Sequence, residues 1–261
     1  MKKEADKVSI ILPYYKKKKF FNKCLNSALN QSYSNKEVII IFDDDDIQEL
    51  KFIKSSILKY KNIKLIKNKK NLGVSKSRNK GIASSKGKYI AFLDCDDFWK
   101  KNKLKFQIQL MKKKNINFSH TDYEIIDKND NILGKMKIQK RISYKGLLKS
   151  CDIGLSTVIV KKNILPKNPF PPIKTKEDYV LWLRLAKKNE IIGLNRMLTK
   201  WRKLENSLSS NITQKIIDAF RVYFIFEKND FLKSCYLTLR LICFAIYKKL
   251  YLQKLTNEKN F

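Results

Sequence analysis

Histidine is almost absent from this sequence of 261 residues, in which His120 is the only one. A metal site built on a pair of histidines is therefore excluded. The five cysteines show neither paired spacing nor a Cys-x-x-Cys motif, which argues against a disulfide framework and suits a reducing compartment. No signal-type apolar region stands before the first strand-like run. We therefore expect a cytoplasmic protein.

Acidic residues are also scarce, since 24 of them stand against 57 lysines and arginines, for a formal net charge of +33. Such an excess ordinarily indicates a polyanion partner, either nucleic acid or an anionic membrane surface. The sequence contains no zinc finger, helix-turn-helix reader or aromatic RNA-binding signature. Its lysine-rich runs at 16–19, 67–70 and 112–114 are typical of solvated faces. We expect no nucleic-acid partner and keep an anionic membrane surface as a candidate.

Apolar runs alternate with helical patterns in the first half of the chain. Strands are predicted at Val8–Leu12, Glu37–Phe42, Asn62–Ile66 and Lys88–Leu93. This alternation predicts an α/β fold with a mostly parallel central sheet and helices on both faces. In the second half we expect a hairpin around Asp127–Asn131, a strand at Leu155–Val160 and a helix that begins near Glu177. The length suits one core rather than two independent domains.

Two of these strands run directly into acidic residues. Asp94, Asp96 and Asp97 follow Lys88–Leu93, and Asp43 begins a run of four aspartates after Glu37–Phe42. Carboxylates this close repel one another unless a hard divalent cation is shared between them or lysines neutralise them. The carboxyl end of a parallel sheet is also where open α/β folds bind ligands.

An arginine lies between the two acidic clusters. Arg78 belongs to the segment Asn71–Gly81, which predicts a turn followed by a short helix. An arginine is suited to grip a phosphate in a fork. Carboxylates for a metal and an arginine for phosphate together favour a nucleoside diphosphate ligand.

These motifs occur in the order found in family 2 glycosyltransferases, which the chain resembles over Lys7–Ser210. The matching segments are Val8–Tyr15, Ser27–Tyr33, Asp43-Asp44, Asn71–Gly81, the Asp-x-Asp-Asp box at Asp94–Asp97, and the Glu-Asp helix at Lys176–Leu185. The resemblance implies the GT-A fold, which is Rossmann-like. It also implies inverting transfer of a sugar from a nucleoside-diphosphate donor, most often a UDP-sugar, to a hydroxyl acceptor.

The resemblance also implies roles for single residues at the matched positions. The nucleotide would be contacted by Pro13, Tyr15, Asp43, Asp44, Arg78 and Asp94. Among these, Tyr15 would stack on the base, and Asp44 would accept a hydrogen bond from the base edge with Asp43 beside it. Arg78 would contact the base or the diphosphate, and Asp94 would lie near the ribose. Asp96 would ligate a divalent metal, Mn²⁺ or Mg²⁺, and Asp178 would be the general base.

The sequence departs from the family pattern at four positions. Lys16 stands where asparagine is usual, and Asp45 and Asp46 replace a glycine and a serine after the first acidic pair. In the segment 201–209, which is similar to the family's Tyr-Arg-x-His-x-x-Ser-x-Ser stretch, Leu204 stands where many members have histidine. The first three changes alter the loop around the base, and the fourth removes any role of that histidine.

Two other classes of function compete with this interpretation. A metal-dependent nucleotidyltransferase would need a glycine-rich, lysine-bearing loop after the first strand, but Pro13–Lys16 contains no glycine. A non-enzymatic membrane- or polyanion-binding module explains the charge but not the ordered acids. The sequence therefore favours a glycosyltransferase that adds one sugar per visit to a glycan or lipid-linked acceptor, in bacterial surface polysaccharide or lipid-linked glycan synthesis.

We expect the chain to divide into a GT-A domain at 1–211 and a basic amphipathic helical tail at 212–261. Helices are predicted at Ile216–Phe226 and Phe231–Leu252. Neither stretch supplies the roughly 20 uncharged residues that a spanning helix needs, and Arg240 at mid-membrane would cost about 2.5–3.5 kcal/mol. The tail would lie flat on the inner face of the cell membrane, or pack on the catalytic domain or a second subunit.

Two further side chains are assigned structural roles. Trp182, on the Glu-Asp helix, is expected in the core. His120, on a strand-like run, is expected to be a hydrogen-bonded structural or acceptor-side residue.

Overall fold

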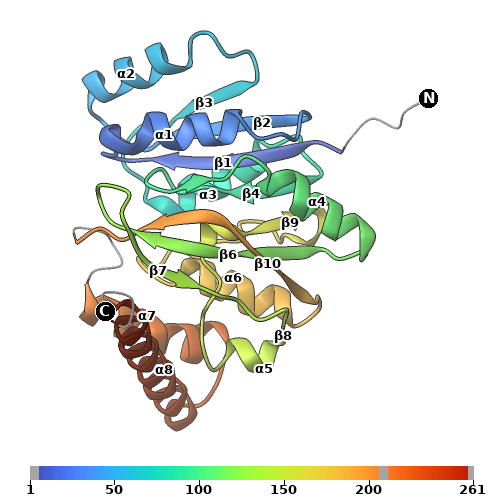
Figure 1. Ribbon diagram of the computed structural model, residues 1–261. Coiled ribbons are helices and arrows are strands. Elements are labelled where there is room, and N and C mark those ends of the chain that lie inside the picture. Colours follow the sequence, from blue (N-terminus) through green and yellow to red (C-terminus); the bar gives the residue numbers. More distant parts are fainter. Residues whose placement is uncertain (1–5, 206–210, 258–261) are drawn as a thin grey trace.

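A ten-stranded sheet with helices on both faces organises the chain in the computed structural model, which describes residues 6–205 and 211–257 (Figure 1). The last residues of the 201–209 segment lie outside the described residues. The strands are β1 (Val8–Tyr14), β2 (Lys36–Phe42), β3 (Ile63–Lys67), β4 (Tyr89–Phe92), β5 (Phe98–Trp99), β6 (Phe118–Ile126), β7 (Ile132–Met136), β8 (Arg141–Ile142), β9 (Ile159–Lys161) and β10 (Ile191–Arg202). Eight of them follow the order β3-β2-β1-β4-β9-β6-β10-β5, while β7 pairs with β6 and β8 with β10.

The parallel half of the sheet matches the sequence prediction. Strand β1 lies between β2 and β4, and Val8 is opposite Lys36 and Tyr89. Strand β3 extends this half beyond β2. Both faces of β1, β2 and β4 are buried, which explains why these strands read as apolar runs, whereas the edge strand β3 keeps Lys64 and Lys67 exposed.

The second half of the sheet mixes directions. Strands β6 and β10 are parallel, whereas β9 is antiparallel to both β4 and β6. The predicted hairpin between β6 and β7 is confirmed, and the Asp127 carboxylate accepts the N–H groups of Asn129 and Asn131 in its turn.

The continuous strand predicted at Leu155–Val160 is wrong. Leu155–Thr157 forms a 3₁₀ turn, η1, and β9 begins only at Ile159. The carbonyl of Gly154 explains the turn, because it accepts both the N–H and the hydroxyl of Thr157, at 3.0 and 2.6 Å. These bonds turn the backbone away from an extended conformation.

The helices pack on the two faces of the sheet. Helices α1 (Lys18–Leu29), α2 (Ile47–Ile57) and α4 (Lys103–Lys113) contribute to one hydrophobic core. Helices α3 (Val74–Ala83), α5 (Tyr144–Leu147) and α6 (Glu177–Ala186) contribute to the other, and a second 3₁₀ turn, η2, covers Lys162–Ile164. Trp182 is fully buried against Phe92 and Phe118, as predicted for a core residue.

The tail consists of α7 (Ile212–Arg221), the π-helical turn η4 (Val222–Phe226) and α8 (Phe231–Asn257). Its inner side belongs to the core, because Val222, Tyr223, Leu237 and Leu241 join the cluster that contains α6. Of the predicted arrangements, packing on the catalytic part is therefore confirmed for this side. Within 6–205 and 211–257, no helix combines the length and apolar character that crossing a membrane requires.

The single histidine lies in the middle of the sheet. His120 on β6 is opposite Gly193 on β10 and has no exposed surface. Neither ring nitrogen has a hydrogen-bond partner among the described residues, so the prediction of a hydrogen-bonded histidine is wrong. Burial lowers the pKa of His120 to about 3.

This burial predicts an acid-dependent stability. Between pH 6.5 and 3 the unfolded chain binds a proton at His120 that the folded chain does not, so stability is lost as pH falls through this window. The contribution is about 2 kcal/mol between pH 7 and pH 5. In urea unfolding at these two pH values, His120→Gln should lose less stability than the parent by about this amount. Equal losses would show that His120 is protonated in the folded protein.

Candidate active site

The sequence-predicted site residues gather at the carboxyl ends of β1, β2 and β4. Pro13 lies at the end of β1, Arg78 and Asp178 lie on α3 and α6, and the other residues lie on the loops that follow the strands. This is the edge of the sheet at which α/β folds bind ligands.

Asp43 holds two loops of this edge together. It is 3% exposed, and its carboxylate accepts the side-chain amide of Asn68 at 2.8 Å and the N–H groups of Leu72 and Gly73 at 2.7 and 2.9 Å. Gly73 has a φ of +84°, a conformation that favours glycine. The Asp43 carboxylate is therefore engaged in hydrogen bonds to other parts of the protein, and these bonds position the turn before α3.

Removing this carboxylate should destabilise the fold. Asp43→Ala leaves two backbone N–H groups and one amide without an acceptor, so we expect a loss of about 2 to 4 kcal/mol in the free energy of unfolding. The exposed neighbour Asp45 is the matched control, and Asp45→Ala should change stability by less than about 0.5 kcal/mol. Chemical denaturation of both variants measures the difference, and similar losses would argue against this role.

Asp44 joins the first two loops of the site. One carboxylate oxygen accepts the N–H of Lys16 at 3.1 Å, and the other accepts the N–H groups of Asp45 and Asp46 at 2.9 and 3.2 Å. Lys16 has a φ of +48°, so the loop after β1 is bent at the position where the family usually has asparagine. Asp44 is 1% exposed, and a base edge would have to reach it through these loops.

Tyr15 presents its ring to solvent beside these buried acids. It is 45% exposed, and the ammonium of Lys16 lies 5.2 Å from the ring centroid. Pro13, at the end of β1, is half-buried and pairs with Ile41 of β2. An exposed aromatic ring at the end of the first strand is suited to stack on a nucleotide base.

Arg78 connects two distant parts of the site. Its guanidinium is buried on α3 and donates to Asp94 at 2.7 Å and to Glu177 at 2.5 Å. Burial opposes its charge, but the two carboxylates raise the pKa of Arg78 above its ordinary value. Both terminal nitrogens bind carboxylates in the structure, and the contact of Arg78 with the base or the diphosphate stays a prediction.

The start of α6 presents two acids with different surroundings. Lys176 precedes it in a left-handed conformation, with φ +67°. Burial raises the pKa of Glu177 to about 7, although Arg78 opposes this shift. Asp178 is half-buried, and one of its oxygens accepts the N–H of Tyr179 at 2.7 Å. Burial also raises the pKa of Asp178, which makes its carboxylate a stronger base.

The acidic box after β4 separates into different roles. Asp97 is buried and accepts the Ser156 hydroxyl at 2.5 Å and the N–H of Arg202 at 2.8 Å, so it holds the turn. Asp96 is partly exposed and pairs with the ammonium of Lys17 at 3.0 Å. Burial raises the pKa of Asp96, an effect that Lys17 opposes and Asp94 reinforces. The expectation that a lysine neutralises the cluster is thus met at Asp96.

The donor atoms fit a divalent cation that is shared with a phosphorylated ligand. The part of the chain that the structure describes contains no group of three or more histidine, cysteine or acidic side chains able to enclose an ion. Asp96, with Asp94 beside it, offers hard oxygen ligands that remain partly exposed. Mg²⁺ and similar ions are often held by one or two carboxylates with the remaining positions filled by phosphate oxygens and water.

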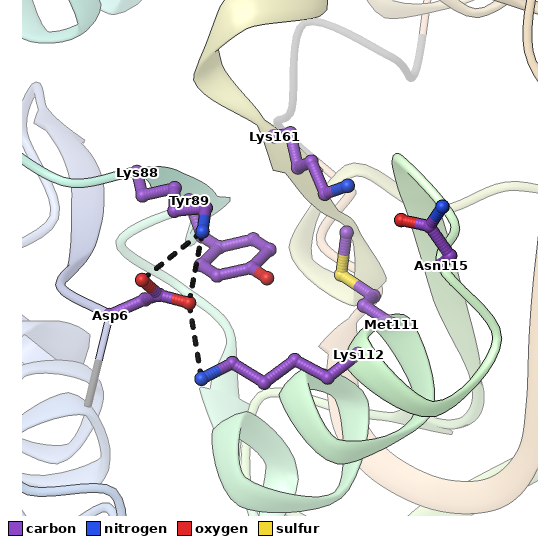
Figure 2. Close-up of a pocket in the computed structure, with 7 residues that line it drawn as sticks. All are labelled: Asp6, Lys88, Tyr89, Met111, Lys112, Asn115 and Lys161. Atoms are coloured by element: carbon purple, nitrogen blue, oxygen red, sulfur yellow. Dashed lines mark hydrogen bonds and ion pairs between the residues drawn. The ribbon is translucent and has the colours of Figure 1, made fainter. Parts of the chain in front are cut away.

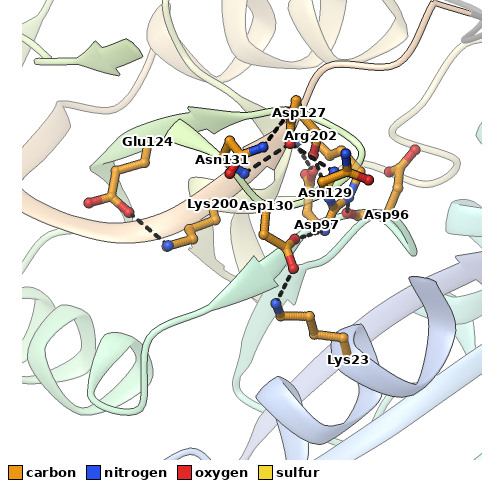
Figure 3. Close-up of polar contacts among 10 residues, drawn as sticks. All are labelled: Lys23, Asp96, Asp97, Glu124, Asp127, Asn129, Asp130, Asn131, Lys200 and Arg202. Atoms are coloured by element: carbon orange, nitrogen blue, oxygen red, sulfur yellow. Dashed lines mark hydrogen bonds and ion pairs between the residues drawn. The ribbon is translucent and has the colours of Figure 1, made fainter. Parts of the chain in front are cut away.

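Sequence reasoning missed the role of Arg202. Figure 3 shows its side chain between the acidic box and the hairpin of β6 and β7. It donates to the carbonyls of Asp96 and Asp127 at 2.9 and 2.5 Å and to the Asp130 carboxylate at 2.5 Å. The signal was present in the Trp201-Arg202 pair of the motif, but nothing in the sequence indicated these partners.

Ser156 was missed as well, because a lone serine in a loop carries no pattern. Its hydroxyl accepts the N–H of Asp94 at 3.0 Å, and its carbonyl accepts the indole N–H of Trp99 at 2.7 Å. Through the Ser156 hydroxyl, the turn η1 therefore binds both Asp94 and Asp97 of the acidic box.

A cavity of about 380 Å³ lies away from this site (Figure 2). It is formed at the amino ends of β1 and β4, where Asp6 pairs with Lys88 at 3.2 Å and Lys112 at 3.1 Å. None of the predicted site residues lines it.

Comparison with known proteins decides the family. The model of the family "Glycosyl transferase family 2" matches residues 9–170. The chain belongs to glycosyltransferase family 2. The resemblance seen in the sequence is thereby confirmed, and the nucleotidyltransferase and non-enzymatic alternatives are set aside in favour of a glycosyltransferase.

Two relatives of this glycosyltransferase match along most of their length. It is 37% identical over 235 residues to the UDP-Glc:alpha-D-GlcNAc-diphosphoundecaprenol beta-1,3-glucosyltransferase WfgD of Escherichia coli, covering 88% of this chain and 90% of the relative. It is 31% identical over 245 residues to the putative teichuronic acid biosynthesis glycosyltransferase TuaG of Bacillus subtilis, covering 93% and 94%.

A solved structure agrees on the fold of this glycosyltransferase. TarS of S. aureus, crystallised with UDP-GlcNAc, superposes with a TM-score of 0.70 at 20% identity, covering 89% of this chain and 70% of that one. The predicted GT-A fold is confirmed.

Proposed function

We propose that this glycosyltransferase transfers a sugar from a UDP-sugar, with glucose as the first to test, to a hydroxyl group of a lipid-linked glycan in bacterial surface polysaccharide synthesis. The observation that carries the proposal is the ion-pair chain from Asp94 through Arg78 to Glu177, which joins the acidic box to the start of α6 beside Asp178. Two relatives from E. coli are named for UDP-Glc and a GlcNAc-diphosphoundecaprenol acceptor, which supports both substrates.

On the donor side, we assign Tyr15 to stacking on the base and Asp96, with Asp94, to a divalent metal. A bound divalent ion would supply positive charge for the departing diphosphate, and a mannosyltransferase of Pyrobaculum calidifontis of similar fold was solved with GDP-Man and Mn²⁺. An ion at Asp96 would compete with Lys17, which pairs with one of the two carboxylate oxygens. Lys17 then remains as a cation at the edge of the donor site. Asp43 and Asp44 position the loops around the base.

On the acceptor side, we assign Asp178 as the general base and Glu177 as a positioning residue. Glu177 accepts a hydrogen bond from Arg78. Within the described residues, Asp178 accepts one hydrogen bond, from the backbone N–H of Tyr179 in its own helix. Asp178 would take the proton of the attacking hydroxyl as the oxygen reaches the anomeric carbon and the diphosphate departs.

This arrangement favours inversion of the anomeric centre. A single displacement needs one base, and Glu177 is held by Arg78 rather than presented as a nucleophile. The sugar of UDP-glucose is α-linked, so the β-linked products for which the E. coli relatives are named imply inversion in those enzymes. We also propose that the chain consists of a catalytic part at 1–211 and a tail at 212–261.

A thermal-shift screen tests the donor part of the proposal. UDP-glucose, UDP-GlcNAc and GDP-mannose would each be added at saturating concentration with and without Mn²⁺. A ligand that binds only the folded state at 100 times its Kd adds about 2.7 kcal/mol of stability, so the melting temperature should rise. We expect a rise for the uridine nucleotides in the presence of Mn²⁺. A rise with GDP-mannose alone, or no dependence on Mn²⁺, would contradict the donor and metal assignments.

A further inference from the structure

Within the described residues, the tail carries most of the exposed large hydrophobic side chains. Within the described residues, twelve large hydrophobic side chains of 211–247 are exposed, against five elsewhere. The most exposed among the twelve are Leu232 at 79%, Ile212 at 71%, Tyr247 at 65%, Leu239 at 63%, Phe231 at 61% and Tyr236 at 60%. We call these side chains of α7 and α8 the tail surface. Exposed apolar side chains gathered on one part of a molecule often mark an interaction site.

The opposite side of the tail is already occupied. The Tyr223 hydroxyl lies 2.9 Å from that of Tyr179 on α6 and donates to the carbonyl of Leu148 at 3.1 Å. Leu237 and Leu241 of α8 are buried in the same core. The tail surface is therefore the outer face of helices whose inner side is already packed on the catalytic part.

The tail surface is coupled to the catalytic end of α6. Asp218 of α7 is fully buried and accepts both the N–H and the hydroxyl of Thr175, at 2.9 and 3.0 Å. Thr175 precedes Glu177 by two residues, so α7 is tied to the segment that leads into the proposed base. Figure 1 shows α7 and α8 together at the end of the molecule opposite α2.

The charge of the tail favours an anionic occupant. Two of its three acids within 211–247 are held by partners inside the protein, because Asp218 binds Thr175 and Glu227 pairs with Lys187 at 2.7 Å, whereas the exposed Asp230 accepts the N–H of Lys233 at the start of α8. The side chains of Lys228 and Lys233 are exposed. A second copy of this chain would carry the same net charge of +33 over the whole molecule, and repulsion between two such copies disfavours self-association.

We propose that the tail surface docks the enzyme in the interfacial region of an anionic lipid bilayer. Its aromatic and aliphatic side chains would enter the headgroup region while the basic side chains contact anionic lipid. The inference deepens the proposed function and rests on it for its purpose, because docking brings the start of α6 to a lipid-linked acceptor. Vesicle binding itself does not depend on catalysis.

The test is co-sedimentation of the full-length protein with vesicles. Deleting the tail would open the core around Tyr179, so we use Leu232→Gln, Tyr236→Gln and Leu239→Gln combined, three exposed positions on α8. The matched control combines Leu58→Gln, Ile132→Gln and Leu133→Gln, which are exposed elsewhere. The parent and the control should pellet with phosphatidylglycerol vesicles and be released in part by high salt. The tail variant should bind at least about tenfold more weakly.

Three outcomes would overturn the proposal: equal binding of the tail variant, equal binding of the parent to neutral phosphatidylcholine vesicles, or a dimer in light scattering that the tail variant dissociates. The last would make a second copy the occupant. Activity on a soluble acceptor with a short lipid chain separates this inference from the proposed function. The tail variant should keep that activity. A parent that binds vesicles but transfers no sugar to any acceptor would contradict the proposed function and leave the docking surface standing.

Discussion

Asp178→Asn should lower turnover by roughly two to four orders of magnitude while leaving the affinity for the donor unchanged. The amide keeps the shape of the side chain and its contact at the start of α6 but cannot accept the acceptor's proton. Donor affinity, measured by calorimetry, and turnover, measured as released nucleotide, together separate binding from chemistry.

The pH profile adds a second readout for this residue. Because burial raises the pKa of Asp178, parent activity should increase with pH as the carboxylate loses its proton, above the range of an ordinary aspartate. Asp178→Asn should lack this rise. Glu177→Gln is the comparison variant, and it should disturb the position of Arg78 without removing the base. If Asp178→Asn retains turnover within about threefold of the parent, Asp178 is only an acid at a helix start and Glu177 becomes the candidate.

Asp96→Ala should abolish metal-dependent donor binding and reduce activity at least about a hundredfold. The fold should persist, because relief of repulsion from Asp94 compensates for the lost pair with the partly exposed Lys17. Mn²⁺ binding followed by electron paramagnetic resonance in the presence of UDP gives a readout that does not depend on turnover. Asp45→Ala, an exposed acid of the neighbouring loop, should behave like the parent. Unchanged Mn²⁺ binding by Asp96→Ala would remove Asp96 from the metal site.

The elements that sequence reasoning predicted well are those whose pattern is local. Strands β1, β2 and β4 are buried on both faces and therefore appear as apolar runs, and acids that follow such runs must lie at one edge of a parallel sheet. The position of the site followed from this rule alone. Trp182 was predicted in the core because its neighbours on the helix are apolar.

What the sequence could not show are contacts between distant segments. Arg78 carried the right charge for a phosphate, but its partner Glu177 lies 99 residues away, and only the folded chain reveals the pair. Arg202 and Asp130 meet in the same way across 72 residues. The two adjacent acids Asp43 and Asp44 look equivalent in the sequence. They differ because the first binds the turn before α3 and the second binds the loop after β1.

His120 illustrates another limit. A histidine on a strand-like run was expected to find a hydrogen bond, since most buried polar groups do. In the fold it is enclosed in the sheet without one among the described residues, at the cost of a strongly lowered pKa. Whether a buried histidine finds a hydrogen-bond partner depends on the packing around it, which the sequence alone does not reveal.

The most direct measurement of the central claim is the configuration of the product. UDP-glucose would be incubated with the enzyme and a synthetic GlcNAc-diphosphate lipid, with Mn²⁺ or with a chelator, and the glycan would be examined by nuclear magnetic resonance. The account predicts a new β-linked glucose and released UDP in the presence of Mn²⁺, and neither in chelator. An α-linked product, or equal transfer in chelator, would contradict it.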